Sequence, residues 1–78
     1  MNIRLNGTEH SVAAGASVST LVSQLTGRAL RPDGQSADGR KLGVAVARNA
    51  EVVPRSQWHA TALAEGDDVE LVTAVQGG

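Results

Sequence analysis

The chain has 78 residues, a formal net charge of -1 and no cysteine. This length allows one domain with one modest core. The near-neutral charge indicates neither nucleic-acid binding nor attachment to an acidic membrane surface. Without cysteine, disulfides, thiolate metal sites and thiol nucleophiles are excluded. No apolar run approaches the ~20 residues of a membrane span. The residues after Met1 form no apolar leader segment, so we expect a cytoplasmic protein.

Residue types that could build a self-contained active site are sparse. The two histidines, His10 and His59, have no second ligand at metal-site spacing. The sequence contains neither a nucleophile elbow nor a glycine-rich phosphate loop. Ser17 is better interpreted as a helix cap than as a nucleophile. We therefore expect a protein that is not an enzyme and that itself binds no metal or cofactor.

The first third of the chain predicts a hairpin followed by a helix. Residues 2–6 alternate between polar and apolar side chains, as in a half-buried strand. Asn6-Gly7 favours a type I′ turn, and residues 8–12 return as a second strand. Beyond the cap at Ser17, apolar residues fall at helical spacing, and Gly27 suits a left-handed helix end. The predicted apolar stripe consists of Val18, Leu21, Val22 and Leu25.

Residues 28–42 interrupt this regular pattern. They contain Pro32, Gly34 and Gly39 among several charged residues, a composition typical of an exposed loop. Long surface loops cost little entropy. We interpret this segment as an insertion without a role of its own.

The second half predicts short strands. Residues 43–48 and 51–53 form a pair joined by a turn at Asn49-Ala50, and Pro54 ends the second of them. Residues 56–58 should form one helical turn that buries Trp58.

The chain then continues into its last strand. Gly66-Asp67 forms a turn, and residues 68–75 form the strand. Asp67 and Asp68 are interpreted as turn residues, and Arg55 as a solvated side chain that could otherwise dock an acidic partner. One main helix with a mixed sheet of four to five strands predicts an α+β fold of the ubiquitin-like β-grasp kind.

Three stretches together resemble one family. Residues 44–58 contain a strand, an asparagine-centred turn, Val53-Pro54-Arg55 and then Trp58, and this order resembles the central signature of the ThiS family. Residues 65–72 are similar to the Gly-Asp turn and final strand of ubiquitin-like sulfur carriers. Residues 73–78 resemble their tail. The likeness covers one domain, residues 1–78, apart from the loop at 28–42.

One departure from the family concerns the central turn. The family commonly has Asn-Gly there, where this chain has Asn49-Ala50. An alanine at positive φ costs on the order of 1 kcal/mol. We therefore expect a different type of turn at this position.

The resemblance implies a sulfur carrier of thiamine biosynthesis that acts through a flexible tail, residues 76–78. A ThiF-like enzyme would use ATP and magnesium to adenylate Gly78. A persulfide relay fed by a cysteine desulfurase would convert it to a thiocarboxylate, and thiazole synthase would accept the sulfur. A carboxylate needs such activation because it is a poor electrophile. Gly77 would provide clearance, since glycine has no β-carbon to obstruct a narrow partner site.

The last strand also predicts a docking face. If Val69 and Leu71 point into the core, the alternate residues lie on the open face of the sheet beside the tail. Exposed small apolar residues beside a reactive terminus favour a partner-docking patch, although scattered aliphatics without a role are the alternative. The predicted docking residues are Glu70, Val72, Ala74, Ala45 and Ala47.

Other functions remain open from the sequence. A carrier for molybdopterin or cysteine synthesis would share the fold and the tail. A ubiquitin-like protein modifier would use the same acyl-adenylate. A plain β-grasp interaction module would not need Gly77 and Gly78 at all.

Overall fold

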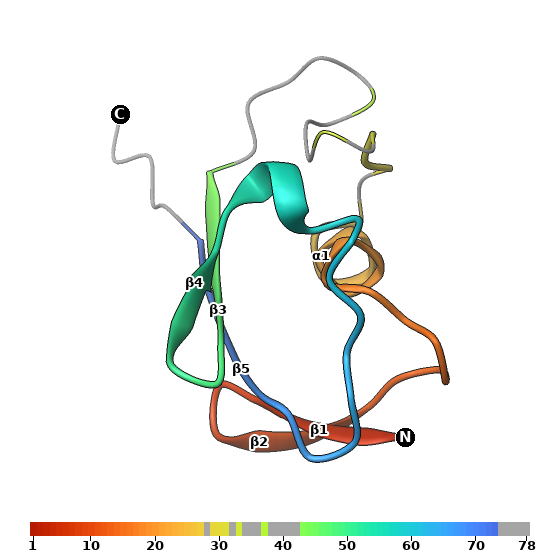
Figure 1. The fold of residues 1–78 in the computed structure, drawn as a ribbon, viewed down its shortest axis with the longest axis vertical. Coiled ribbons are helices and arrows are strands. Elements are labelled where there is room, and N and C mark those ends of the chain that lie inside the picture. Colours follow the sequence, from red (N-terminus) through yellow and green to blue (C-terminus); the bar gives the residue numbers. More distant parts are fainter. Residues whose placement is uncertain (28, 32, 34–36, 38–42, 74–78) are drawn as a thin grey trace.

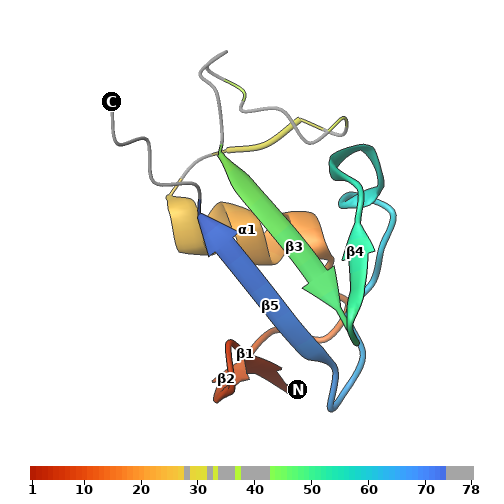
Figure 2. The same cartoon turned by 90° about the vertical axis from the view of Figure 1, so that its left-hand side faces the viewer.

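The computed structural model describes residues 1–27, 29–31, 33, 37 and 43–73. Its elements are β1 (Asn2–Leu5), β2 (Thr8–Ser11), α1 (Val18–Thr26), β3 (Val44–Arg48), β4 (Glu51–Val53), the 3₁₀ turn η1 (Arg55–Gln57) and β5 (Asp68–Thr73). One five-stranded sheet has the order β2-β1-β5-β3-β4. Helix α1 covers one face of this sheet, and Figure 2 looks onto the other face, which carries no helix.

The sheet is mixed, as predicted. Strands β1 and β5 pair in parallel, with Leu5 opposite Val69, whereas the other strand pairs are antiparallel. The first and last strands therefore meet inside the sheet (Figure 1). This arrangement confirms the α+β prediction.

The predicted hairpin turn and helix ends are confirmed. Asn6 and Gly7 both have positive φ, 51° and 81°, as a type I′ turn requires. Ser17 caps α1, because its Oγ accepts a hydrogen bond from the Thr20 amide at 3.2 Å. At the other end, Gly27 is left-handed, and its amide donates to the carbonyl of Ser23 at 2.9 Å.

The apolar stripe of α1 is shorter than predicted. Val18, Leu21 and Val22 are fully buried, but Leu25 is 42% exposed. Helical spacing predicts the face of the helix on which a residue lies, but it gives no information about how far the core extends along that face.

The turn at Asn49-Ala50 corrects the expectation of a different turn type. Asn49 and Ala50 have φ values of 52° and 66°, the positive pair of a type I′ turn. Arg48 lies opposite Glu51 in the β3–β4 register, so only two residues connect the strands. A two-residue connection favours a primed turn, and the strand pairing therefore holds Ala50 in a conformation that alanine rarely adopts.

The core lies between α1 and the covered face of the sheet. Trp58 is 1% exposed, and its indole Nε1 donates to the carbonyl of Val53 at 3.0 Å. The predicted burial of Trp58 is confirmed, and the helical turn η1 directly precedes it. The buried apolar residues are Ile3, Val12, Ala16, Val18, Leu21, Val22, Val44, Val46, Trp58, Leu63 and Val69.

Arg55 is not the solvated side chain that the sequence suggested. Its guanidinium lies over the Trp58 ring, 5.0 Å from the centroid, and Nη2 donates to the carbonyl of Val44 at 3.2 Å. The side chain thus covers the indole and joins η1 to β3. Stacking of a guanidinium on an aromatic ring favours this placement.

Two predicted segments fall largely or wholly outside the described residues. These are the loop at 28–42 and the tail at 76–78; the last strand, predicted to reach residue 75, is described to Thr73. In the part of the chain that is described, no helix has the length and apolar character needed to cross a membrane.

Candidate docking face and the strand that leads to the tail

The predicted reactive end lies beyond the described residues. Ala74, Gly77 and Gly78 belong to the segment that the structure does not describe. Strand β5, which leads to this segment, lies between β1 on one side and β3 on the other. Its last residue, Thr73, is opposite Val44 at the start of β3. The geometry of the site is therefore the geometry of β5 and of the open sheet face around it.

The structure brings four of the predicted docking residues together. Ala45 lies opposite Val72, and Ala47 lies opposite Glu70. Directly opposed residues of antiparallel strands share a face, so all four lie on the face away from α1. Val72 is 62% exposed. The predicted arrangement of these residues on the sheet is confirmed, whereas their role in docking stays a prediction.

Val52 belongs to the same surface and was missed by the sequence analysis. It lies opposite Ala47 and is 73% exposed. The structure shows its direction, because Val53 packs against the core and neighbouring strand residues point to opposite faces. Ala45, Ala47, Val52 and Val72 are called the apolar patch from here on.

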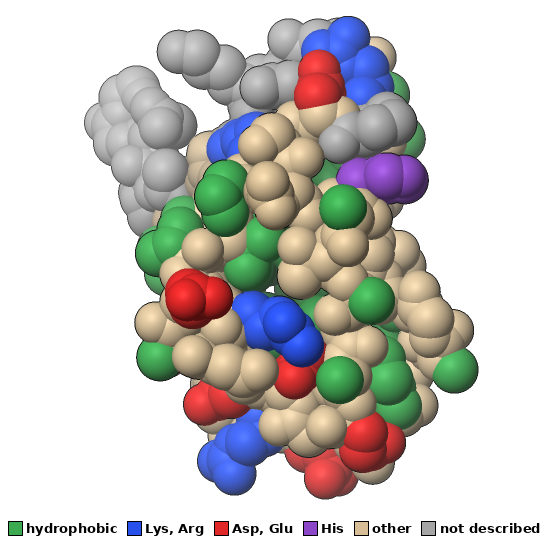
Figure 3. All heavy atoms as spheres, in the orientation of Figure 1, with side chains coloured by type: hydrophobic (Ala, Val, Ile, Leu, Met, Phe, Trp, Pro, Cys, Tyr) green, Lys and Arg blue, Asp and Glu red, His purple; other side chains and the backbone are tan. Residues whose placement is uncertain are grey.

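The β1 side of the open face carries charged residues. The strand registers place Arg4 opposite Glu9 on one side and Asp68 on the other. Glu70 lies between this charged half and the apolar patch. Figure 3 shows a different side of the molecule, on which basic and acidic side chains are interspersed and do not form a large patch of one sign.

A shallow hollow lies where β3 begins and β5 ends. Its volume is about 290 Å³, and it is lined by Gly43, Val44, Ala45, Arg55 and Val72. Arg55 is the one basic residue among its described lining residues. The hollow therefore continues the apolar patch to Arg55, beside the last described residues of β5.

Asp67 anchors the start of β5 and does more than form a turn. Its carboxylate accepts hydrogen bonds from Arg48 Nε at 2.7 Å, from the Ala64 amide at 2.8 Å and from Asn49 Nδ2 at 3.2 Å. Burial by itself raises the pKa of this carboxyl group. The hydrogen bonds and the charge of Arg48 outweigh burial and hold the pKa below its ordinary value of 3.8. Sequence alone gave no sign of Arg48 and Asn49 as partners, because both come from another segment, whereas Ala64 belongs to the same turn as Asp67.

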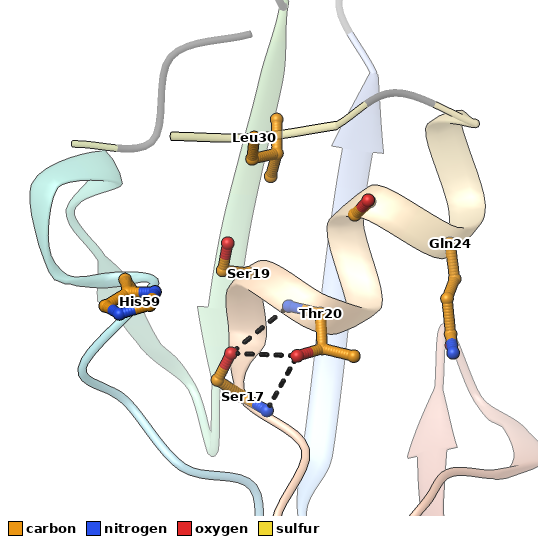
Figure 4. A pocket seen from close by; sticks show the side chains of 7 residues that line it. Ser17, Ser19, Thr20, Gln24, Leu30 and His59 are labelled. Atoms are coloured by element: carbon orange, nitrogen blue, oxygen red, sulfur yellow. Dashed lines mark hydrogen bonds between the residues drawn. The ribbon is translucent and has the colours of Figure 1, made fainter. Parts of the chain in front are cut away.

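A second hollow, of about 320 Å³, lies beside the first turn of α1 (Figure 4). Its lining includes Ser17, Ser19, Thr20 and the exposed ring of His59. The helix amides here already have acceptors. Those of Val18 and Ser19 bond the carbonyls of Thr61 and Trp58, and that of Thr20 bonds Ser17 Oγ. This end of the helix therefore offers no set of free amides of the kind that binds phosphate.

Metal chemistry has no apparent place in the described residues. Within residues 1–27, 29–31, 33, 37 and 43–73, no group of three or more histidine or acidic side chains lies close enough to hold a metal ion. Asp67 is occupied by Arg48 and Asn49.

Fold and site together define a class of protein. A mixed sheet with a parallel central pair and one helix across one face describes a ubiquitin-like β-grasp protein, here with an apolar patch beside the last described strand. The model of the ThiS family matches residues 3–78. The chain therefore belongs to the ThiS family, the sulfur carriers of thiamine biosynthesis.

Curated relatives are of two lengths. The sulfur carrier protein ThiS of Escherichia coli K12 is 33% identical over 78 residues, which cover all of both chains. Thiazole synthases of Paramagnetospirillum magneticum and Magnetococcus marinus are 35% and 37% identical over the whole of this chain. This chain spans only 20% of the length of each of those synthases.

Solved structures show the same fold. The crystal structure of the thiamine biosynthesis protein ThiS from Geobacter metallireducens superposes with a TM-score of 0.69 at 32% identity, with all of both chains covered. SAMP1 from Haloferax volcanii superposes with a TM-score of 0.54 at 26% identity, over 99% of this chain and 97% of the other. The fold is thus shared with both of these proteins.

Proposed function

We propose that this chain carries sulfur for the synthesis of the thiazole ring, as a thiocarboxylate on the carboxyl group of Gly78. The observation that supports this most strongly is the match with the E. coli sulfur carrier along the whole of both chains. In this chain the matched region ends in Gly77-Gly78, and β5 leads toward these residues from the edge of the apolar patch. Other proteins supply the chemistry, and this chain supplies the carboxyl group.

The activation step uses ATP and magnesium on a ThiF-like adenylating enzyme. A carboxylate oxygen of Gly78 attacks the α-phosphorus of ATP, and magnesium pyrophosphate leaves. The product is an acyl-adenylate, whose AMP is a good leaving group. Gly77 and Gly78 suit this step because neither has a β-carbon to obstruct the approach to the nucleotide.

The sulfur then comes from a persulfide that a cysteine desulfurase supplies through a relay. The terminal persulfide sulfur attacks the carbonyl carbon of Gly78, and AMP leaves with the electron pair of the C–O bond. A second thiolate of the relay attacks the cysteine sulfur of the resulting acyl disulfide. One disulfide forms in the relay, and the thiocarboxylate is released with both electrons of the broken S–S bond.

Thiazole synthase is the proposed acceptor of this sulfur. Two proteins named thiazole synthase contain a segment that matches this chain from end to end. In those proteins a domain of this kind is therefore part of the same polypeptide as the synthase. This supports the synthase as the partner over an enzyme of molybdopterin or cysteine synthesis.

The apolar patch is the proposed docking surface for the adenylating enzyme. Ala45, Ala47, Val52 and Val72 are neighbours in the register, and the two valines are 73% and 62% exposed. Val72→Glu would place an unpaired charge in this interface. We expect it to weaken binding by roughly a hundredfold. Pyrophosphate exchange should then need more carrier for half-saturation and reach the same plateau, whereas deletion of Gly78 should abolish exchange at every concentration.

The decisive experiment is the intact mass of the chain after incubation with the adenylating enzyme, ATP and a sulfur source. One oxygen replaced by sulfur adds about 16 Da, and we expect this gain in the C-terminal peptide. The variant lacking Gly78 should gain nothing. Sulfur on another peptide, or an adduct that joins the tail to lysines of other proteins, would contradict the proposal; the second result would favour a protein modifier.

A further inference from the structure

Two asparagines occupy equivalent places in the two hairpin turns. Asn6 and Asn49 are each the first of two turn residues, and their φ values are 51° and 52°. Both side chains reach β5, although at different points. Asn49 Oδ1 accepts from the amide of Asp68 at 2.9 Å, at the beginning of the strand. Asn6 bonds Leu71, in the half of the strand that precedes the tail.

The carboxamide of Asn6 bonds both backbone groups of Leu71. Its Oδ1 accepts from the Leu71 amide at 2.9 Å, and its Nδ2 donates to the Leu71 carbonyl at 3.2 Å. A carboxamide carries the same donor and acceptor as a peptide group. The side chain of Asn6 therefore occupies the place that a further residue of β1 would take in a parallel ladder.

This contact matters because β1 is short. Its last residue, Leu5, lies opposite Val69, and the backbone amide of Asn6 donates to the Val69 carbonyl at 2.9 Å. The backbone of the chain then turns into β2. On the other side, β3 follows β5 as far as Thr73. Beyond Val69, the described hydrogen bonds from the β1 side of β5 come from Asn6.

We propose that Asn6 is a positioning residue for the carrier tail. Its side chain holds the end of β5 on the side where β1 has stopped, and so fixes the direction of the last described residues of the strand that leads to Gly78. It also fixes the residue beside Val72 of the apolar patch. This inference rests on the proposed function, because the direction of the tail matters only if a partner must receive Gly78.

Asn49 provides the matched control. Its carboxamide holds the opposite end of the same strand, and it also contacts the anchoring carboxylate, with Nδ2 3.2 Å from Asp67 Oδ1. Asn6→Gly and Asn49→Gly each remove one carboxamide and keep a residue that tolerates positive φ. Both variants lose stability, but only Asn6→Gly releases the end of β5 from which the tail leaves.

Pyrophosphate exchange with the adenylating enzyme separates the two variants. For Asn6→Gly we expect the half-saturating carrier concentration to rise about threefold to tenfold, because a strand end that must be ordered on docking weakens binding. The plateau should stay near the parental value. For Asn49→Gly both quantities should match the parent once the folded fraction is taken into account. Asn6→Asp retains the acceptor for the Leu71 amide, so it should restore part of the loss.

Amide hydrogen exchange provides a readout that does not need the enzyme. In Asn6→Gly, exchange at Val72 and Thr73 should accelerate relative to Val46, whereas Asn49→Gly should leave that ratio unchanged. Equal shifts for both variants in either measurement, or no shift for Asn6→Gly, would overturn the inference. If the parental chain supports no pyrophosphate exchange at all, it is the proposed function that fails, and hydrogen exchange still decides whether Asn6 orders the end of β5.

Discussion

The two faces of the sheet are built from alternate residues of the same strands, yet they differ in exposure. On the covered face, Ile3, Val46 and Val69 are at most 2% exposed. On the open face, Val52 and Val72 are 73% and 62% exposed. Valine therefore occupies both faces and is buried on only one of them. Residue type alone therefore does not distinguish a residue that stabilises the fold from one that is proposed to dock a partner. The distinction depends on which face of the sheet the strand position points to and on which face α1 covers.

This difference predicts where substitutions cost stability and where they cost binding. The covered face should dominate the free energy of unfolding, because burial of apolar area stabilises the fold in proportion to that area. The open face should contribute little to folding and much to contacts with partners. The following substitutions test that division, beginning with the largest expected effect on stability.

Trp58→Ala should produce the largest loss. The indole is 1% exposed and donates to Val53 at 3.0 Å, so its removal leaves a cavity and an unsatisfied carbonyl. We expect a loss of about 3–5 kcal/mol in the free energy of unfolding, measured with chemical denaturant. Trp58→Phe should lose less, because the ring still fills part of the space. A loss below about 1 kcal/mol for Trp58→Ala would place the residue outside the core.

Asp67→Asn should have an intermediate effect that depends on pH. The side chain is 7% exposed and its partner Arg48 is 32% exposed, so the pair is partly screened. We expect a loss of about 1–3 kcal/mol at neutral pH. The pKa of Asp67 is lowered by folding, so its contribution is present above the unfolded pKa and is lost as pH falls through the lower, folded pKa.

Denaturant unfolding at a series of acidic pH values checks the sign of this effect. As the pH falls below 3.8, the ordinary value for this carboxyl group, the parental chain should lose more stability than Asp67→Asn, and the two should converge. Parallel curves would show that the pKa of Asp67 does not change on folding.

Ala50→Gly should stabilise the protein. Ala50 has a φ of 66°, a conformation that costs alanine on the order of 1 kcal/mol and glycine almost nothing. We expect a gain of about 0.5–1 kcal/mol in thermal or denaturant unfolding. Gly7→Ala is the matched control in the first hairpin, where φ is 81° and no heavy atom lies within 4 Å of an added β-carbon. Gly7→Ala should lose a similar amount of stability. If Ala50→Gly also lost stability, the positive φ of Ala50 would not be strained by the pairing of β3 with β4.

Val52→Thr and Val72→Thr should have the smallest effects on stability. Both exchange one methyl for a hydroxyl at an exposed position, so we expect changes within about 0.5 kcal/mol. Their effect should instead be seen as weaker binding to the adenylating enzyme. The matched change on the covered face is Val46→Thr, at 2% exposure, which should cost about 1–3 kcal/mol because it buries a hydroxyl. Equal losses of stability for Val46→Thr and for the two open-face variants would contradict the assignment of one face to folding and the other to binding.

Several local features could be predicted because they depend on residues close in sequence. The Asn6-Gly7 turn needs two residues that tolerate positive φ, and the helix needs Ser17 and Gly27 at its ends. Alternation along 68–73 placed Val69 inward and Val72 outward. Each of these features is determined by backbone conformation or by strand geometry over a few residues, so the sequence was sufficient to indicate them.

Other features depend on segments that meet only in the folded chain. Helical spacing assigned Leu25 to the buried stripe, but the side chain is 42% exposed because helical periodicity does not indicate how far the core extends. The pairing of β3 with β4 imposes positive φ on Ala50 against its own preference. Arg55 covers Trp58, and Asp67 is surrounded by Arg48, Asn49 and Ala64. Arg55 and Trp58, like Ala64 and Asp67, are only three residues apart, and residue type alone did not indicate that their side chains meet. The hydrogen bonds of Asp67 with Arg48 and Asn49 have no periodic signal along the chain, because these partners come from a distant segment.

The sequence by itself determined the elements, their order, the α+β class, the likeness to the ThiS family and the residues proposed to carry the chemistry, Gly77 and Gly78. Only the tertiary structure decided that Val52 joins Ala45, Ala47 and Val72 on one face, and that Asn6 and Asn49 hold opposite ends of β5. The physical reason is the range of the interactions. Turn and cap preferences act within a few residues, whereas strand register and side-chain hydrogen bonds across the sheet exist only after distant segments have paired.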